Sequence, residues 1–119
     1  MTTAVALIVG AGPGTSASCA RLFSQQGMRV AVAARTPGKP ELQRLASEHG
    51  VRCYQCDAQE PDAVSELFRA VEEDLGPPSL VVHNIDGRTT DIFRKDITNA
   101  DPGLVRDTLM NSTYSAFLV

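Results

Sequence analysis

The sequence contains no tryptophan, and its aromatic residues make up only 5% of 119 positions. Few side chains are therefore available for stacking on nucleic-acid bases. Lysine and arginine form no run, and the formal net charge is −3. A protein that binds phosphate backbones by bulk electrostatics needs a basic patch, so the composition disfavours a nucleic-acid partner.

Long apolar runs are also missing. The longest, residues 4–9, is far shorter than the roughly 20 residues of a membrane-spanning helix. The start Met1-Thr2-Thr3 lacks the basic region of a secretory signal. We therefore expect a soluble, cytoplasmic protein that has no membrane partner.

Cysteine is scarce, since the chain has only Cys19, Cys53 and Cys56. An odd number this small cannot form a disulfide scaffold. Cys53 and Cys56 have the C-x-x-C spacing, but their segment has the pattern of a strand, in which residues three apart point to opposite faces. We predict structural thiols, with a redox or metal role as the alternative. No metal site is expected, because only His49 and His83 could add ligands.

Strand and helix patterns alternate four times along the chain. The expected strands are residues 4–9, 29–34, 51–56 and 80–82, and the expected helices are 15–26, 41–49, 61–75 and one that starts at 102. Right-handed crossovers between such units give an open parallel sheet with helices on both faces. In the last helix, we expect Val105, Leu109 and either Ala116 or Phe117 to point inward.

A glycine-rich turn, residues 10–14, joins the first strand to the first helix. Residues without a Cβ let the backbone approach a pyrophosphate, and a helix N-terminus favours an anion. The alternative is a set of glycines that only form the turn.

In this context the sequence resembles the short-chain dehydrogenase/reductase family along its whole length. The family turn reads T-G-x-x-x-G-x-G: Gly10 and Gly14 match, Val9 replaces the Thr, and Ser16 replaces the last Gly. The resemblance implies a Rossmann-like doubly wound α/β sheet of strand order 3-2-1-4. Residues 1–119 would form one NAD(P)-binding domain that is incomplete relative to the family domain. A flavodoxin-like fold is the alternative.

The resemblance also implies a dinucleotide site. Arg35 follows Ala34, which stands where an NAD-selecting acid would be, so we predict NADP(H) in preference to NAD(H), with Lys39 as a helper. An ordinary solvated arginine is the alternative. Asp57 would contact the adenine, or else cap the turn before Pro61. The cofactor-binding residues expected from the resemblance are Gly10, Gly12, Gly14, Thr15, Ser16, Arg35, Thr36, Asp57, Ala58 and Asn84.

The loop after the fourth strand departs from the family pattern N-N-A-G. Asn84 matches, whereas Ile85 replaces Ala, Asp86 stands at the Gly, and Gly87 comes one residue late. Further on, the family has an Asn that holds a proton-relay water. The alignment puts Ser112 there and Asn111 one residue early, a rotation of about 100° on a helix. Asn111 or Ser112 is the candidate, and Asn111 can serve only if the helix shifts.

The catalytic Y-x-x-x-K of the family is absent, because neither Tyr54 nor Tyr114 is followed by a lysine at that spacing. We expect the NADP(H)-binding portion of an oxidoreductase for a small carbonyl or alcohol substrate, inactive alone. A non-catalytic dinucleotide-binding or regulatory module, and a degenerate fragment, are the alternatives. The apolar end 116–119 favours a piece of a longer protein, or self-association through the last helices.

Overall fold

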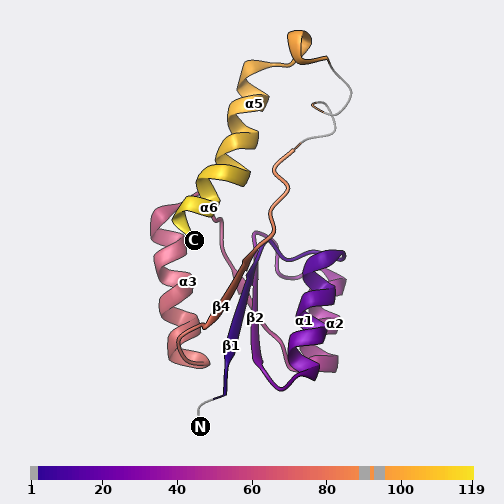
Figure 1. The fold of residues 1–119 in the computed structure, drawn as a ribbon, viewed down its shortest axis with the longest axis vertical. Coiled ribbons are helices and arrows are strands. Elements are labelled where there is room, and N and C mark those ends of the chain that lie inside the picture. Colours follow the sequence, from indigo (N-terminus) through magenta and orange to yellow (C-terminus); the bar gives the residue numbers. More distant parts are fainter. Residues whose placement is uncertain (1–2, 89–91, 93–95) are drawn as a thin grey trace.

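A computed structural model describes residues 3–88, 92 and 96–119 of the chain. The molecule measures 54 × 26 × 21 Å. Figure 1 shows why it is elongated: a sheet with its helices forms the lower body, and a C-terminal helix extends beyond the upper end of the strands. The sequence predicts a loop over residues 84–90, after the fourth strand. The structure describes this loop as far as Arg88, and residues 89 and 90 lie outside the described residues.

Four parallel strands form one sheet in the order β3-β2-β1-β4. The strands are β1 (Val5–Val9), β2 (Arg29–Ala34), β3 (Arg52–Gln55) and β4 (Leu80–His83). In the centre, Ile8 of β1 pairs with Val32 of β2 on one side and with Val82 of β4 on the other. The observed order confirms the predicted α/β class and the 3-2-1-4 topology.

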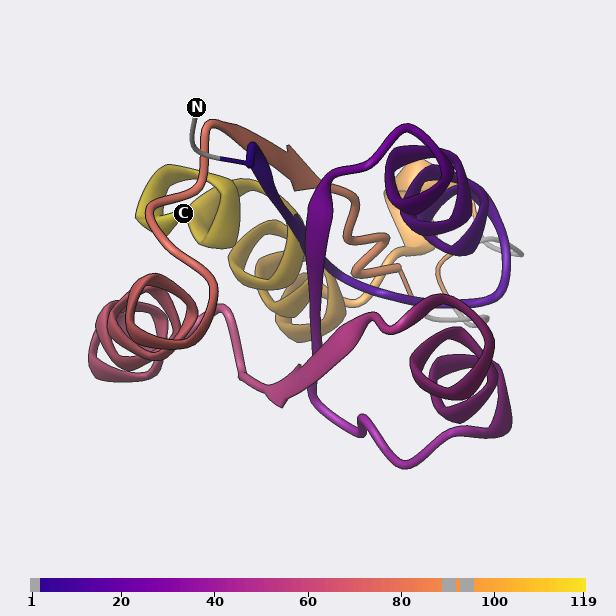
Figure 2. The same cartoon turned by 90° about the horizontal axis from the view of Figure 1, so that it is seen from below.

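Helices cover both faces of this sheet, as can be seen in Figure 2, where the view runs along the strands. Helices α1 (Thr15–Gln25) and α2 (Pro40–His49) pack on one face, and α3 (Pro61–Asp74) packs on the other. Pro61 occupies the first turn of α3, as predicted. Proline suits this position because the amides of the first turn have no hydrogen-bond partner within the helix. Each face has its own apolar core, and both cores share the central strands.

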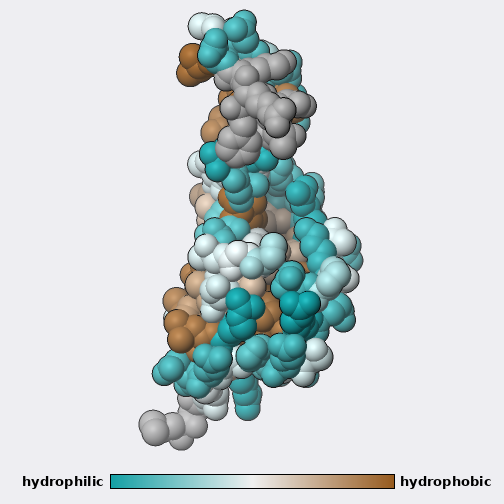
Figure 3. Space-filling model, turned by 90° about the vertical axis from the view of Figure 1, so that its right-hand side faces the viewer, coloured by the Kyte–Doolittle hydropathy of each residue, from teal (hydrophilic) through white to brown (hydrophobic). Residues whose placement is uncertain are grey.

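The two central strands are the most buried elements of the sheet, in keeping with their continuous apolar sequences. The edge strand β4 is open to solvent instead: Leu80 and Val81 are 37% and 39% exposed. Figure 3 shows the side of the molecule, where hydrophobic patches interrupt a mostly hydrophilic surface. Within the described part of the chain, β4 therefore has no strand beside its outer edge.

The C-terminal segment is one helix with a π-helical turn in it. Helix α5 (Pro102–Leu109) leads into the π turn η2 (Met110–Tyr114) and then α6 (Ser115–Leu118), after the short 3₁₀ helix η1 (Ile97–Asn99). Asp101 caps α5, since its Oδ2 accepts a hydrogen bond from the Leu104 amide. Within η2, the Ser115 amide donates to the carbonyl of Met110 five residues back, so the turn contains one extra residue.

The inward face predicted for this helix is wrong. Val105, Leu109 and Phe117 are exposed, Phe117 at 81%, and Ala116 is exposed as well. Ser115 is buried instead, and Leu118 and Val119 pack against the core on the α3 side. Two physical causes account for the error. The π turn rotates the residues that follow it, and only the last part of the helix reaches the body.

Cys53 and Cys56 contact opposite cores, as the strand periodicity predicts. All three cysteines are free, and Cys56 is buried whereas Cys19 and Cys53 are half-buried. Burial raises the pKa of the Cys53 and Cys56 thiols, which makes the reactive thiolate scarce. Within the described ranges, no group of histidine, cysteine or acidic side chains could hold a metal ion, and no helix has the length and hydrophobicity to span a membrane.

Candidate functional site

A cavity of about 420 Å³ opens at the carboxyl ends of the strands. It lies where β2 and β4 flank β1, which is the point at which the strand order reverses and where ligands bind in open α/β sheets. The residues that line it come from the strand ends and from η2. They are Val9, Gly10, Ala11, Ala33, Ala34, Arg35, Thr36, Lys39, Cys56, Asp57, Ala58, Gln59, Asn84, Ile85, Asp86 and Asn111.

Gly10 starts the turn after β1 and can only be glycine. Its φ is +92°, and a Cβ there would lie 2.3 Å from the carbonyl oxygen of Asn84. The amides of Gly10 and Ala11 both donate to the carbonyl of Ala33 at 3.0 Å. The β1 turn is therefore in close contact with the ends of both neighbouring strands.

Ser16 holds this arrangement from within α1. It is 2% exposed, and its hydroxyl donates to the Gly10 carbonyl at 3.0 Å while accepting from Asn84 Nδ2 at 3.0 Å. The hydroxyl proton is used inside the protein, so Ser16 Oγ is not directed at a ligand. Ser16 and Asn84 instead join the two loops that border the cavity.

Gly12 and Gly14 differ from Gly10. Neither has a positive φ, and a Cβ on either would meet no atom within 4 Å. Gly14 is also the residue before α1, and no side chain caps the amides of that first turn. Gly12, Gly14, Thr15 and Ser16 do not line the cavity itself, but they border an uncapped helix N-terminus beside open space.

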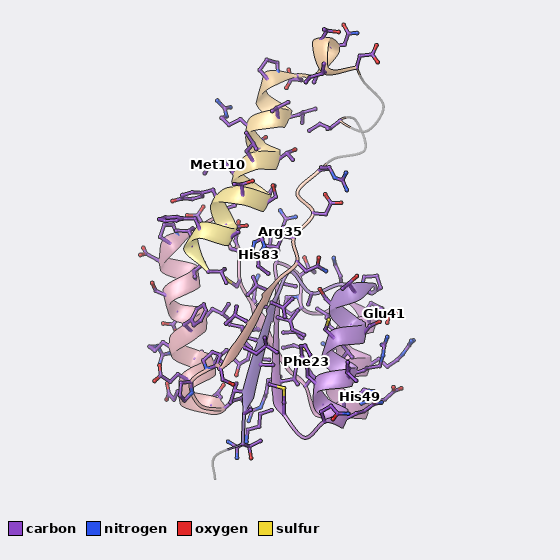
Figure 4. The ribbon with its side chains drawn as sticks, viewed as in Figure 1. Phe23, Arg35, Glu41, His49, His83 and Met110 are labelled. Carbon is purple, nitrogen blue, oxygen red and sulfur yellow. The ribbon has the colours of Figure 1, made fainter. Side chains whose placement is uncertain are left out.

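Positive charge is placed at one end of the cavity by the turn after β2. Arg35, Thr36 and Lys39 line this end, and both cationic side chains are exposed. In Figure 4, Arg35 lies at the upper end of the sheet, away from Glu41 on α2. Among the described residues, Arg35 forms no ion pair, so its guanidinium is available to an anionic ligand.

Asp57 follows the edge strand β3 and lines the cavity. Its Oδ1 accepts a hydrogen bond from the Gln59 amide at 3.1 Å, and its carbonyl accepts from the Glu60 amide. The residue thus forms the turn before α3 and reaches the cavity as well, so the two interpretations of Asp57 are compatible. Ala58 beside it is buried.

Asp86 places a carboxylate at the other end of the cavity. Arg88 pairs with it through Nε and Nη2, each at 2.8 Å from a different carboxylate oxygen, and through its amide. These hydrogen bonds lower the pKa of Asp86 to about 2. Asp86 stands where the family pattern has a glycine. The guanidinium of Arg88 compensates the negative charge that Asp86 adds to the loop.

The π turn brings Asn111, and not Ser112, to the wall of the cavity. Asn111 lines the cavity, whereas the Ser112 hydroxyl donates to the Thr108 carbonyl at 2.6 Å on its own helix. Gly87 packs against this turn, since a Cβ there would lie 2.5 Å from Asn111 Cβ and 2.9 Å from the Thr108 carbonyl. The extra residue of η2 shifts the helix at this point, and Asn111 stays a predicted relay residue.

Sequence reasoning missed Gln59. Its Nε2 donates to Asn111 Oδ1 at 2.6 Å across the cavity wall, between segments 52 positions apart. The only signal in the sequence is its place between Asp57 and Pro61, in the loop that leaves the carboxyl end of the third strand.

Neither tyrosine lines the cavity. Tyr54 donates to Asp74 Oδ2 at 2.7 Å on the edge strand, and Tyr114 stacks on Phe117 with ring centroids 6.3 Å apart. Within the described residues, the cavity therefore has no tyrosine that could exchange a proton with a substrate.

Residues 10–119 match the family model described as enoyl-(acyl carrier protein) reductase. The chain is 33% identical to 3-oxoacyl-[acyl-carrier-protein] reductase MabA of Mycobacterium tuberculosis, over 92 residues that make up 77% of this chain and 34% of the relative. An uncharacterized oxidoreductase of Caenorhabditis elegans is 35% identical over 88 residues, which are 70% of this chain and 28% of that protein.

Solved structures give the same result. The crystal structure of an actinorhodin polyketide ketoreductase with NADPH superposes with a TM-score of 0.80 at 26% identity, covering 100% of this chain and 46% of the ketoreductase. A Serratia marcescens short-chain dehydrogenase/reductase gives 0.85 at 17% identity, covering 98% and 48%. The chain thus spans about a third of the length of the curated relatives and about half that of the structures. It belongs to the short-chain dehydrogenase/reductase family.

Proposed function

We propose that this chain is the NADP(H)-binding portion of a short-chain dehydrogenase/reductase that interconverts a carbonyl compound and an alcohol. The observation that carries the proposal is the cavity at the reversal of strand order, with uncapped helix amides beside it and free cations at one end. The nicotinamide, when bound, supplies or accepts the hydride, and residues 1–119 contain no Y-x-x-x-K that could serve as the catalytic Tyr and Lys of the family.

The residues present fit a dinucleotide. A Cβ on Gly12 or Gly14 would meet no atom within 4 Å, so the turn leaves room for a dinucleotide to pass close to its backbone, which supports the proposal. The amides at the start of α1, at Thr15 and Ser16, would face the pyrophosphate, since helix N-termini favour anions. Asn84 would hold the opposite loop in place through Ser16.

The preference for NADP(H) over NAD(H) rests on the turn that follows β2. Ala34 is buried and offers no carboxylate to ribose hydroxyls, whereas Arg35 and Lys39 are exposed cations on the cavity wall. A guanidinium can contact a 2′-phosphate at two points, and Thr36 can add a hydroxyl donor. Asp57 and Ala58 would lie at the adenine, and Asn111 would occupy the relay position.

Calorimetric titration of the chain with NADPH and NADH tests this proposal. We expect NADPH to bind more tightly by about tenfold or more, because a charge-assisted hydrogen bond contributes about 1.5–3 kcal/mol. Equal affinity would contradict the preference, and no heat with either cofactor at millimolar concentration would contradict the proposed site.

A non-catalytic dinucleotide-binding module is the second candidate, favoured by the positions of Tyr54 and Tyr114 away from the cavity. Both candidates predict cofactor binding. The coding sequence past residue 119 separates them: a continuing frame with a Ser and a Y-x-x-x-K would identify the enzyme, and a stop codon would favour the module. The relatives named as reductases of 3-oxoacyl groups make a ketone the substrate class to test first.

We also propose that the helix α5–α6 self-associates. Val105, Leu109 and Phe117 on it are exposed, and exposed apolar side chains gathered on one helix favour an interface. Light scattering should then report a species larger than a monomer, whereas a monomer that binds no hydrophobic dye would contradict this. The cytoplasmic location stays a prediction from the sequence.

A further inference from the structure

We propose that Gln59 is a positioning residue, which holds the side-chain amide of Asn111 in one orientation so that Asn111 presents hydrogen-bond donors to the cavity. The proposal rests on the proposed function only in taking a dinucleotide as the occupant of that cavity.

The contact itself is short and lies at the site. Gln59 Nε2 donates to Asn111 Oδ1 at 2.6 Å, both side chains are half-buried, and both line the cavity. Gln59 comes from the loop after β3, and Asn111 comes from the π turn. Met110, labelled in Figure 4, marks where this turn begins above the end of the sheet. The hydrogen bond therefore crosses from the sheet body to the C-terminal helix.

Gln59 is itself anchored at its backbone. Its amide donates to Asp57 Oδ1 at 3.1 Å, in the turn that leads into α3. Its side chain is consequently extended from a loop of fixed shape toward η2. Through Gln59, the residue proposed to contact the adenine, Asp57, is linked to the residue at the relay position, Asn111.

The backbone of Asn111 is fixed independently. Its carbonyl accepts a hydrogen bond from the hydroxyl of Ser115, which is fully buried and lies 2.9 Å from His83 Nε2 at the end of β4. On the other side, Gly87 packs so closely against Asn111 that no Cβ fits there. What these contacts leave undetermined is which end of the Asn111 amide faces the cavity.

In the structure, Gln59 fixes that orientation by presenting its donor end, Nε2, to Asn111. A side-chain amide has an acceptor oxygen and a donor nitrogen at its two ends. Because the Gln59 donor occupies Oδ1, Asn111 Nδ2 is the group left to face the cavity. Nδ2 offers N–H donors to an acceptor oxygen, such as those on the nicotinamide half of a dinucleotide. Arg35 and Lys39, which line the same cavity, are the groups proposed for the phosphate.

The first test needs no ligand. Solvent exchange of the Gln59 side-chain amide protons, followed by NMR, should be at least several-fold slower than that of the exposed Gln25 on α1. Asn111→Ala should raise the Gln59 rate to that of Gln25, and Asn111→Asp should keep it slow, because a carboxylate still accepts. Fast exchange of Gln59 in the unsubstituted chain would overturn the proposal.

The second test separates positioning from a purely structural effect. Gln59→Ala keeps the backbone amide that bonds Asp57, so the affinity for adenosine 2′,5′-bisphosphate should not change. The dissociation constant of NADPH should rise about 3–10-fold, the worth of one hydrogen bond. The matched variant Gln25→Ala should alter neither constant. Equal weakening of both ligands, or of neither, would overturn the proposal.

The two tests also distinguish the failure of this proposal from the failure of the proposed function. If the unsubstituted chain binds neither ligand, the proposed NADP(H) site fails. The exchange measurements still decide whether Gln59 orients Asn111.

Discussion

Asn84 and Ser16 are joined by a hydrogen bond of 3.0 Å, and the same Ser16 hydroxyl donates to the carbonyl of Gly10. Ser16, which stands where the family pattern has a glycine, thus connects the loop after β4 to the turn after β1. The two loops that border the cavity are held together by one buried hydroxyl.

Ser16→Ala should therefore reduce the free energy of unfolding by about 1–3 kcal/mol, because Asn84 Nδ2 and the Gly10 carbonyl lose their partner in a buried place. Urea unfolding measures the change. Ser18→Ala is the matched control on the same helix, where the side chain is exposed and the change should stay within about 0.5 kcal/mol. Equal effects of the two substitutions would contradict this role of Ser16.

The glycines of the turn should separate into two kinds. Gly10→Ala forces a Cβ to within 2.3 Å of the Asn84 carbonyl at a φ of +92°, so we expect a loss of stability of roughly 2 kcal/mol or more. Gly12→Ala meets nothing within 4 Å, so stability should change by less than about 0.5 kcal/mol. Its effect should appear in the affinity for NADPH. If Gly12→Ala left that affinity unchanged, no ligand would pass beside the turn.

Arg35→Ala should weaken NADPH binding by roughly 10–100-fold and leave NADH binding nearly unchanged, because only NADPH carries the 2′-phosphate. Calorimetry in a buffer of fixed ionic strength measures both constants. Arg44→Ala on α2 removes an exposed arginine paired with Glu41 at 3.8 Å and serves as the control for lost charge. Equal losses for the two cofactors would show that Arg35 does not read the phosphate.

Tyr54 predicts a dependence on alkaline pH. Burial, and then the hydrogen bond to Asp74, raise its pKa from 10.0 to about 12. The folded state holds this proton more tightly than the unfolded state, so the stabilisation is complete below pH 10 and is lost as the pH rises toward 12. Absorbance of tyrosinate in a Tyr114→Phe background should follow Tyr54 alone. Adding Asp74→Asn should lower the midpoint, and an unchanged midpoint would contradict the role of Asp74.

The fold followed from local sequence patterns to a large degree. The apolar run of β1 predicts a strand that is buried on both faces. Val64, Leu67, Phe68, Val71 and Leu75 recur at helical spacing and predict α3, in which Val64, Leu67 and Val71 are buried. Patterns of this kind depend on neighbours a few positions apart. The π turn does not, because the inward face was predicted at constant helical spacing, and one extra residue in the turn changes the phase of everything after it.

The site was predictable where the fold alone positions a residue. Gly10, Arg35, Asp57 and Asn84 follow successive strands, so parallel pairing brings them to one edge and around one cavity. The side-chain partners were not predictable. Ser16 bonds Asn84, and Gln59 bonds Asn111 from 52 positions away, and both contacts depend on how the loops meet in three dimensions.

The π turn has a consequence for the comparison of this chain with its relatives. Five residues, Met110–Tyr114, occupy a turn that four would occupy in an uninterrupted α-helix. Such a turn acts as a one-residue insertion that the helix absorbs without a loop. An ungapped alignment, anchored on Phe117, with a helix that lacks such a turn is therefore shifted by one position for residues before the turn. A gap placed inside the helix would then move Asn111 to the column that Ser112 otherwise takes.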